Sequence, residues 1–226
     1  MEPNDERLRT PRAAGLAGAV FAVLTAAAIV LVRIAVPSGN PADAAVDPDE
    51  RWAVRVAVEM LPFAGIFFLW FMGSLRAMVG DAEDRFIATV FLGSGLVFVA
   101  TLFGAGAAAG TVLSETQPSG FGRHFAYTLM TTYALRMAAV FVLTTSTIGH
   151  RLGVFPRPLA VFGYLAGLVL LVVGSGVPWS ELVFPAWALV VSVHILRASP
   201  RRAASRPRVH AEQEGARRGY GKADPR

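Results

Sequence analysis

Six long apolar stretches follow one another along this chain, and they constrain its fold more than any other feature. Each holds about 20 predominantly apolar residues, the length that an α-helix needs to cross the hydrocarbon core of a bilayer. They cover residues 13–36, 53–75, 86–113, 125–149, 159–177 and 179–196. The apolar residues are continuous and do not alternate with the period of two that a membrane β-barrel requires. Because a helix satisfies its own backbone hydrogen bonds inside lipid, we expect an all-α, polytopic membrane bundle of six transmembrane helices.

The composition agrees with this interpretation. Hydrophobic residues make up 54% of the chain and charged residues only 16%, and the mean hydropathy is +0.50. A soluble domain carries about 25% charged residues and needs a largely polar surface. An ordinary soluble enzyme and a standard nucleic-acid-binding domain are therefore excluded. The chain has no cysteine, so it has no disulfide, no thiolate metal ligand and no cysteine nucleophile.

The distribution of basic residues predicts the orientation in the membrane. Of the 21 lysines and arginines, sixteen lie in the two terminal tails and in the second and fourth loops, and three lie in the remaining loops. Because basic residues accumulate on the cytoplasmic side, we expect both termini in the cytoplasm. The net charge of +5 is then a topology signal, and no nucleic-acid partner is expected.

The chain divides into a short cytoplasmic tail at 1–12, a six-helix transmembrane domain at 13–196 and a basic cytoplasmic tail at 197–226. The first apolar stretch has an uncharged run of 20 residues, longer than the 7–15 residues of a signal peptide, so we expect it to be retained. The C-terminal tail has nine basic and three acidic residues and few large apolar ones. We expect it to be disordered and to contact anionic lipid head groups.

Charged residues inside the apolar stretches are the strongest indication of function in this sequence, because their insertion into lipid is costly. Arg136 lies near the middle of the fourth stretch, and Glu59 in the second stretch is its natural partner. Thr128, Thr132 and Arg136 follow one another at four-residue spacing and so share one helical face, with Tyr133 beside them. This polar stripe is expected to face protein or water rather than lipid.

Two interpretations of this candidate intramembrane polar site stay open. In one, Glu59 and Arg136 form a buried ion pair that fixes helix packing. In the other, they line a cavity for a solute, a proton or an anionic head group. Arg33 and Glu181 lie near the outer face, where snorkelling of their side chains to the interface would explain them. Glu181 also precedes Pro185, much as Glu59 precedes Pro62, and paired broken helices can mark a transporter site.

Other chemistry finds little support in the sequence, and no cofactor or metal is expected. His150 and His194 both lie at the cytoplasmic ends of apolar stretches, where a site with two histidine ligands for haem is conceivable, but they have no partner acids. No zinc-protease or nucleophilic-serine motif is present.

Small residues recur at helical spacing in two stretches. They are Gly104, Gly106 and Gly110 in the third stretch, and Gly163 and Gly167 in the fifth. Such faces permit close helix contact, either within one chain or between copies in a homo-oligomer.

Several segments resemble a group of uncharacterised actinobacterial integral membrane proteins. The segments cover 61–73, 83–95, 136–141, 144–149 and 156–164, and they read LPFAGIFFLWFMG, EDRFIATVFLGSG, RMAAVF, TTSTIG and PRPLAVFGY. The similarity extends over roughly 53–196. It implies a helical bundle in a bacterial inner membrane, and it implies no reaction, ligand or catalytic residue.

Three functions are consistent with these features. The first is a non-enzymatic accessory or packing subunit with Glu59 and Arg136 as a structural pair. The second is a small transporter or channel-like protein with a site between the second, fourth and sixth helices. The third is a membrane-embedded enzyme acting on lipid, which the shortage of acids, histidines and activated serines disfavours.

Overall fold

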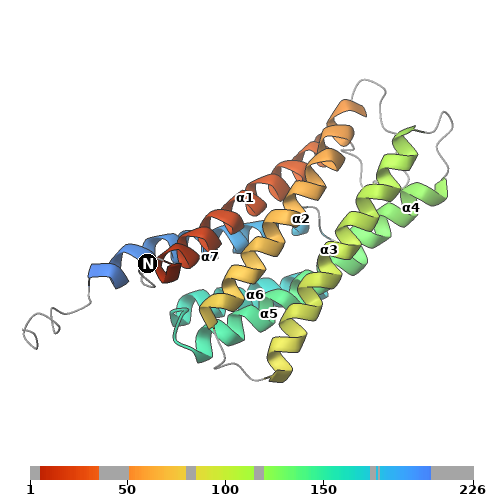
Figure 1. Ribbon diagram of the computed structural model, residues 1–226. Helices are drawn as coiled ribbons and strands as arrows, with labels where there is room; N and C mark the ends of the chain where they lie inside the picture. Colours follow the sequence, from red (N-terminus) through yellow and green to blue (C-terminus); the bar gives the residue numbers. More distant parts are fainter. Residues whose placement is uncertain are drawn as a thin grey trace, which may run out of the picture.

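The computed structural model describes residues 6–35, 51–79, 85–114, 120–173, 177 and 179–204, and these residues are helical almost throughout. The elements are α1 (Glu6–Ala35), α2 (Arg51–Val79), α3 (Arg85–Ser114), α4 (Gly120–Thr128), the π-helix η3 (Leu129–Ala134), α5 (Leu135–Arg151), α6 (Arg157–Val172), the 3₁₀ turn η5 (Ser180–Leu182) and α7 (Val183–Ala204) (Figure 1). No strand occurs among the described residues. The predicted all-α bundle is confirmed.

Five helices are long and apolar enough to cross a membrane. They span Arg12–Ile34, Arg51–Met78, Arg85–Ser114, Phe121–Arg151 and Ser180–Ala198. The fourth of these is a continuous helix made of α4, η3 and α5.

Helix α6 is apolar but shorter than the predicted fifth span. Its 16 residues measure about 24 Å, against a hydrocarbon core of about 30 Å. The sequence after Val173 continues Gly-Ser-Gly-Val-Pro, and glycine and proline have the lowest helix propensities. Residues 174–176 and 178 lie outside the described part of the chain.

The first and last helices extend beyond the predicted spans. Helix α1 begins at Glu6, and α7 continues to Ala204. The two helices therefore continue into the predicted tails, and the candidate membrane spans within them begin at Arg12 and end at Ala198. Alanine and arginine favour the helix, so α7 need not end where its apolar residues end. Residues 1–5, the loop 36–50 and the remainder of the basic tail from 205 lie outside the described residues.

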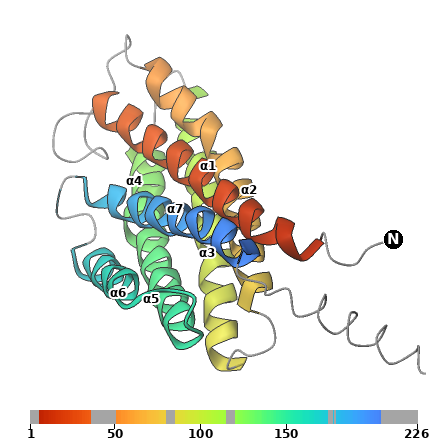
Figure 2. The same ribbon diagram turned by 90° about the vertical axis from the view of Figure 1, so that its left-hand side faces the viewer.

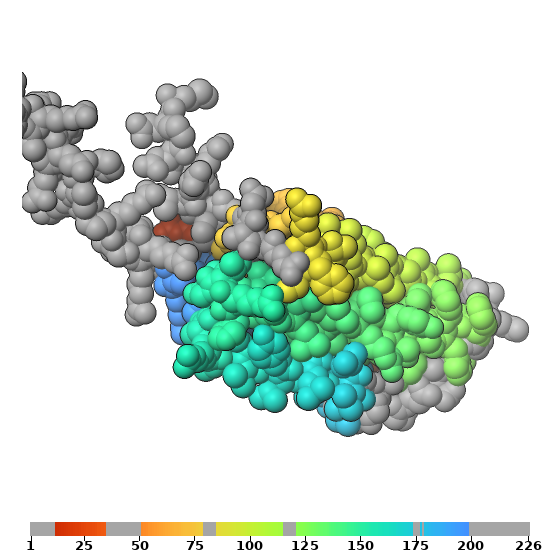
Figure 3. Space-filling view, turned by 90° about the horizontal axis from the view of Figure 1, so that it is seen from below, coloured from red at the N-terminus to blue at the C-terminus, as the bar shows by residue number. Residues whose placement is uncertain are grey.

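The helices form a ring in which each contacts its neighbours. Helix α1 packs most extensively against α2 and α7, α2 against α3, α3 against the α4–η3–α5 helix, α5 against α6, and α6 against α7. The first and last helices are antiparallel, so α1 begins beside the C-terminal end of α7 (Figures 1 and 2). On the face formed by α3, α5 and α6, the side chains make one continuous surface (Figure 3).

Aromatic rings fill the centre of this ring of helices. Phe21, Phe68, Phe98, Phe141 and Phe184 come one each from α1, α2, α3, α5 and α7, and each is at most 3% exposed. The Phe68 ring lies 4.9–5.0 Å, centre to centre, from the rings of Phe21, Phe98 and Phe141. We call these five residues the aromatic cluster. It joins five helices at one point, and its tilted rings have the geometry that aromatic pairs prefer.

Glycines of the predicted small-residue faces pack against helices of the same chain. A Cβ added at Gly106 would lie 3.2 Å from Leu61 of α2. A Cβ at Gly163 would overlap the Ser146 hydroxyl of α5, and one at Gly167 would lie 2.6 Å from Leu143. At these three positions the small residues allow close packing between helices of one chain.

Large apolar side chains lie on the outside of the bundle. Phe63 is 60% exposed, Trp70 63% and Val172 73%. Lipid tails solvate such residues as well as a protein core does, so helices in a membrane need no polar outer face. This surface is consistent with a multi-pass membrane protein.

Candidate intramembrane binding cavity

The predicted polar stripe lies on the outside of the bundle. Thr128, Tyr133 and Arg136 are exposed, and Thr132 is half-buried. The Arg136 guanidinium donates from Nη1 to the backbone carbonyl of Thr132 at 2.9 Å, so its recorded bond is within its own helix. The stripe therefore does not face the interior of the bundle.

Packing explains which face of this helix is buried. Thr131, Ala134, Leu135 and Ala138 lie against the other helices and are at most 6% exposed. These side chains are small or apolar, and small residues let helix backbones approach closely. The arginine is excluded from the packed face and points outward.

Glu59 is also exposed, and it is not joined to Arg136. It lies on the outer face of α2 with Val56 and Phe63, and it makes no hydrogen bond or ion pair with the other described residues. The parallel drawn from the prolines also fails. Pro62 lies inside the unbroken helix α2, whereas Pro185 lies in the first turn of α7, where a missing backbone N–H is tolerated.

The ion pair that does form joins Arg33 to Glu181. The Arg33 Nη2 donates to Glu181 Oε1 at 2.6 Å, and the two side chains are 13% and 9% exposed. Arg33 lies in the last turn of α1 and Glu181 in η5, directly before α7. Trp179 begins that turn with a left-handed φ of 70°. The pair therefore connects the first and last membrane helices.

The sequence contained a signal for this pair, which a search for charged residues in the middle of the apolar stretches does not use. The first apolar stretch ends, and the sixth begins, on the same predicted side of the membrane. One carries an arginine at that end and the other a glutamate. The two residues are 148 positions apart, so only the closure of α7 onto α1 brings them together.

A cavity of about 230 Å³ lies beside this ion pair, between α1, α2, α3, the α4–η3–α5 helix and the start of α7. Its polar lining residues are Thr25, Arg33, Arg123, Tyr127, Thr131 and Glu181. Its small lining residues are Ala28, Ala57, Ala105, Ala109, Ala126 and Ala134. Larger apolar side chains, including Leu61, Leu102, Leu135, Phe98 and Phe184, complete the wall.

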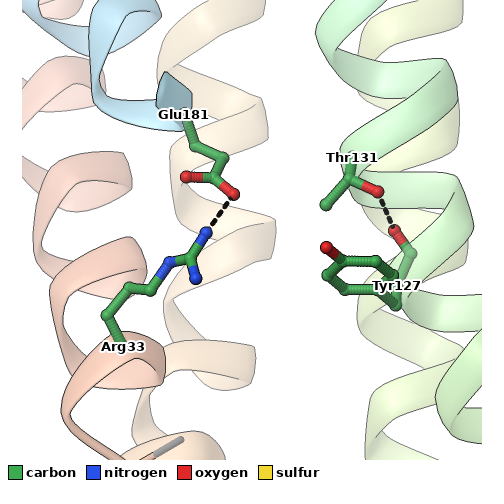
Figure 4. Close-up of polar contacts among 4 residues, drawn as sticks. All are labelled: Arg33, Tyr127, Thr131 and Glu181. Carbon is green, nitrogen blue, oxygen red and sulfur yellow. Dashed lines mark hydrogen bonds and ion pairs between the residues drawn. The ribbon is translucent and has the colours of Figure 1, made fainter. Parts of the chain in front are cut away.

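The polar groups of the cavity lie on opposite walls. Figure 4 shows the Arg33–Glu181 pair on one side and Tyr127 and Thr131 on the other, with the Tyr127 phenol extending toward the pair. The Thr131 hydroxyl donates to the Tyr127 carbonyl at 2.8 Å, which leaves the phenol as the more available polar group on that wall.

Glu181 Oε2 and the Thr25 hydroxyl are buried in the wall and lack a hydrogen-bond partner among the described residues. A buried polar group without a partner is costly, so each one calls for a partner beyond the described residues.

The π-helix helps to shape the wall opposite the ion pair. It covers Leu129–Ala134 and contributes Met130, Thr131 and Ala134 to the cavity. π-Helical turns are rare and occur frequently at functional sites. A π-helical turn holds more residues than an α-helical turn, so it changes the direction in which the side chains after it leave the helix. The hydrophobic pattern of the sequence does not reveal this change.

The described residues contain no group of three or more His, Asp or Glu side chains that could hold a metal ion. His150 is exposed at the end of α5, whereas the His194 ring packs edge-on against Phe155 at 6.3 Å. The two histidines are thus placed differently, and His194 has an aromatic packing partner.

Comparisons with protein-family models, with curated proteins and with solved structures found no match to this chain.

Proposed function

We propose that this protein is a multi-pass membrane protein that binds an amphiphilic molecule in its intramembrane cavity, as a binding protein or carrier. The observation that supports this function best is a largely apolar cavity of about 230 Å³ with a buried ion pair in its wall. An engineered apolar cavity of about 150 Å³ already admits benzene. A cavity of this size therefore accepts part of an alkyl chain, while the charged residues suit a polar head.

Among the functions considered from the sequence, the cavity favours the transporter-like alternative over an accessory or packing subunit. The predicted transporter site lay between the second, fourth and sixth helices, and α2, the α4–η3–α5 helix and the start of α7 all line the cavity. Its proposed polar residues change, however. Arg33, Arg123 and Tyr127 take the place of Glu59 and the Arg136 stripe, and Glu181 is common to both sets.

The test is to block the cavity. Ala105 of α3 lines it and is 3% exposed, whereas Ala107 lies two residues further along α3 and is exposed. We expect Ala105→Leu to lower retention of single-chain dodecyl amphiphiles about fivefold or more, because fitting the chain beside the larger side chain would then carry an overpacking cost of about 1–3 kcal/mol. Native mass spectrometry of the protein released from lipid nanodiscs measures the retained adducts.

Ala107→Leu is the matched control and should leave retention unchanged. Ala57→Leu, from the α2 wall of the cavity, should repeat the loss if Ala105→Leu disturbs folding. Thermal unfolding of each variant measures whether the helical bundle is intact. Retention by wild type that neither cavity variant lowers would contradict the proposed function, and so would the absence of any retained amphiphile.

We also propose a bacterial inner membrane, on the resemblance described above, with both chain ends in the cytoplasm. The adjacent start of α1 and end of α7 support a common side for the termini.

Single cysteines in this cysteine-free chain test the orientation. Phe121 and Arg151 are exposed residues at opposite ends of the same membrane helix. A membrane-impermeant maleimide should label Phe121→Cys in intact cells and Arg151→Cys only after the cells are permeabilised. The reverse pattern would contradict the proposed orientation.

A further inference from the structure

Thr25 and Glu181 lie at the same level of the bundle, on neighbouring elements of the cavity wall. Thr25 is one helical turn after Phe21 on α1. Glu181, in η5, is about one turn before Phe184 of α7. The rings of Phe21 and Phe184 are 5.5 Å apart, centre to centre. Because α1 and α7 are antiparallel, Thr25 and Glu181 both lie about one turn from this ring contact and on the same side of it (Figures 1 and 2).

Glu181 offers one unused acceptor at this level. Its Oε1 accepts a hydrogen bond from Arg33 at 2.6 Å, whereas its Oε2 has no hydrogen-bond partner among the described residues. The Glu181 side chain is only 9% exposed, so this oxygen lies inside the bundle. A carboxylate oxygen can only accept, so a ligand that satisfies it must carry an O–H or N–H group.

Thr25 offers an unused hydroxyl. Threonines inside helices commonly donate to a carbonyl one turn earlier, as Thr131 and Thr145 do at 2.8 and 2.7 Å. The Thr25 hydroxyl has no partner among the described residues, and the residue is 7% exposed. Since a hydroxyl can donate as well as accept, it can complete the hydrogen bonding of a group that donates to Glu181.

The hydroxyl group of an alcohol matches both of these atoms. It has one proton to donate to Glu181 Oε2 and lone pairs to accept from the Thr25 hydroxyl. An ionised carboxylate or sulfate has no proton for Oε2, and a quaternary ammonium has no N–H group. Either charge would also lie beside an ion pair whose members, Arg33 and Glu181, already neutralise each other. It would gain little attraction from that pair to offset the loss of its hydration.

The surrounding wall is suited to a hydrocarbon chain. Along α3 the lining runs from Leu113, near the end of that helix, to Phe98 in its middle, which is about 22 Å at the rise of an α-helix. Every residue that α3 contributes to the lining is apolar. The two unused polar atoms are thus set in a largely apolar wall, the pattern that a long-chain alcohol requires.

We propose that the cavity binds a single-chain amphiphile through an uncharged hydroxyl head, which donates to Glu181 Oε2 and accepts from the Thr25 hydroxyl. This inference rests on the proposed function, and it adds the chemistry of the head and the two residues that recognise it. Thr131 also lines the cavity, but its hydroxyl is bonded within its own helix and takes no part in recognition.

The experiment varies the head at constant chain length. The probes are carbon-14-labelled dodecanol, 1-methoxydodecane, dodecane, dodecyl sulfate and dodecyltrimethylammonium. Each is added in the same small amount to the full-length protein in nanodiscs of zwitterionic lipid, and its retention is normalised to the amount that enters empty nanodiscs. The methyl ether keeps the oxygen but lacks the proton, so we expect about fivefold weaker retention than for dodecanol, the effect of one hydrogen bond. The two charged probes should be retained at least about tenfold less than dodecanol.

Two valine variants separate the head site from the rest of the wall. Thr25→Val removes the unused hydroxyl at nearly constant volume, so we expect about fivefold weaker retention of dodecanol and unchanged retention of dodecane. Because an unpartnered buried hydroxyl is costly, the ligand-free variant should be at least as stable as wild type in thermal unfolding. Thr131→Val is the matched control from the opposite wall, where the residue is 4% exposed, and it should leave retention of dodecanol unchanged.

Equal normalised retention of dodecanol and its methyl ether would overturn this inference while leaving the proposed function standing. Equal losses from Thr25→Val and Thr131→Val would overturn it as well, since any change in the wall would then explain the effect. So would retention of either charged probe as strong as that of dodecanol. If no probe is retained at all, the proposed function itself fails.

Discussion

Replacing Glu181 with alanine is expected to destabilise the folded protein by about 3–5 kcal/mol, the cost of breaking a buried ion pair by removing one partner. The reason is the guanidinium that is left behind. The Arg33 side chain is 13% exposed, and its bond to Glu181 is the side-chain interaction that the structure records for it. Without the carboxylate, a positive charge would lie inside a helical bundle at a helix end that packs against α2 and α7. Unfolding in mixed detergent micelles, followed by tryptophan fluorescence, measures the change.

The double variant Arg33→Met with Glu181→Leu separates charge from packing. Well-packed apolar replacements of a buried pair are often neutral or stabilising, so the double variant should lose much less than Glu181→Ala alone. Glu59→Ala is the control, because Glu59 is an exposed glutamate on α2 and its loss should change stability by no more than about 0.5 kcal/mol. Equal effects of Glu181→Ala and Glu59→Ala would show that the Arg33–Glu181 pair contributes nothing measurable to stability, which is the case for many exposed ion pairs.

The fold was largely predictable because the membrane leaves the chain few choices. Inside lipid every backbone N–H and carbonyl must be bonded within its own segment, so a run of 20 apolar residues is sufficient to indicate a helix. Helix ends were less predictable. Helix α7 continues past Arg197 because arginine and alanine favour helix even where the apolar pattern stops, and α6 ends at Val172 where glycine and proline follow.

The candidate site was predictable only in part, for a geometric reason. Position along a helix gives depth in the membrane, and on depth alone Glu59 and Arg136 were a reasonable pair. Contact also depends on the direction in which each side chain leaves its helix, and both of these point out of the bundle. Thr131, only five residues before Arg136, faces the cavity instead.

The residues of the candidate site that the sequence did not single out are those whose position in it depends on tertiary structure. Arg123 and Tyr127 resemble ordinary interfacial residues at the start of a membrane helix. They become part of a cavity wall only because α1 and η5 bring Arg33 and Glu181 to the opposite side. Six alanines on four helices line the cavity, and their small side chains leave its volume unfilled. None of these alanines is unusual by itself.

Replacing Phe68 with alanine is expected to lower the free energy of unfolding by about 3–5 kcal/mol. Phe68 is fully buried, and its ring lies 4.9–6.0 Å from the rings of Phe21, Phe98, Phe141 and Phe184. Inside a membrane, packing contacts rather than escape from water hold helices together, so removal of the central ring weakens contacts with four other helices at once. The same unfolding measurement gives the loss.

Phe63→Ala is the matched control, since that ring lies five residues earlier on α2 and is 60% exposed. It should change stability by no more than about 0.5 kcal/mol. Comparable losses at both positions would contradict a central role for the aromatic cluster.

The Phe68 substitution also bears on the cavity, because two of its neighbours, Phe98 and Phe184, form part of the cavity wall. Loss of the Phe68 ring leaves space directly behind them, and apolar cavities of this kind accept apolar guests. A chain that lies against Phe98 and Phe184 in the cavity would reach this space, so Phe68→Ala should improve retention of hexadecanol relative to dodecanol, although the protein is less stable. A change of chain preference that is the same in Phe63→Ala would instead place the chain outside the bundle.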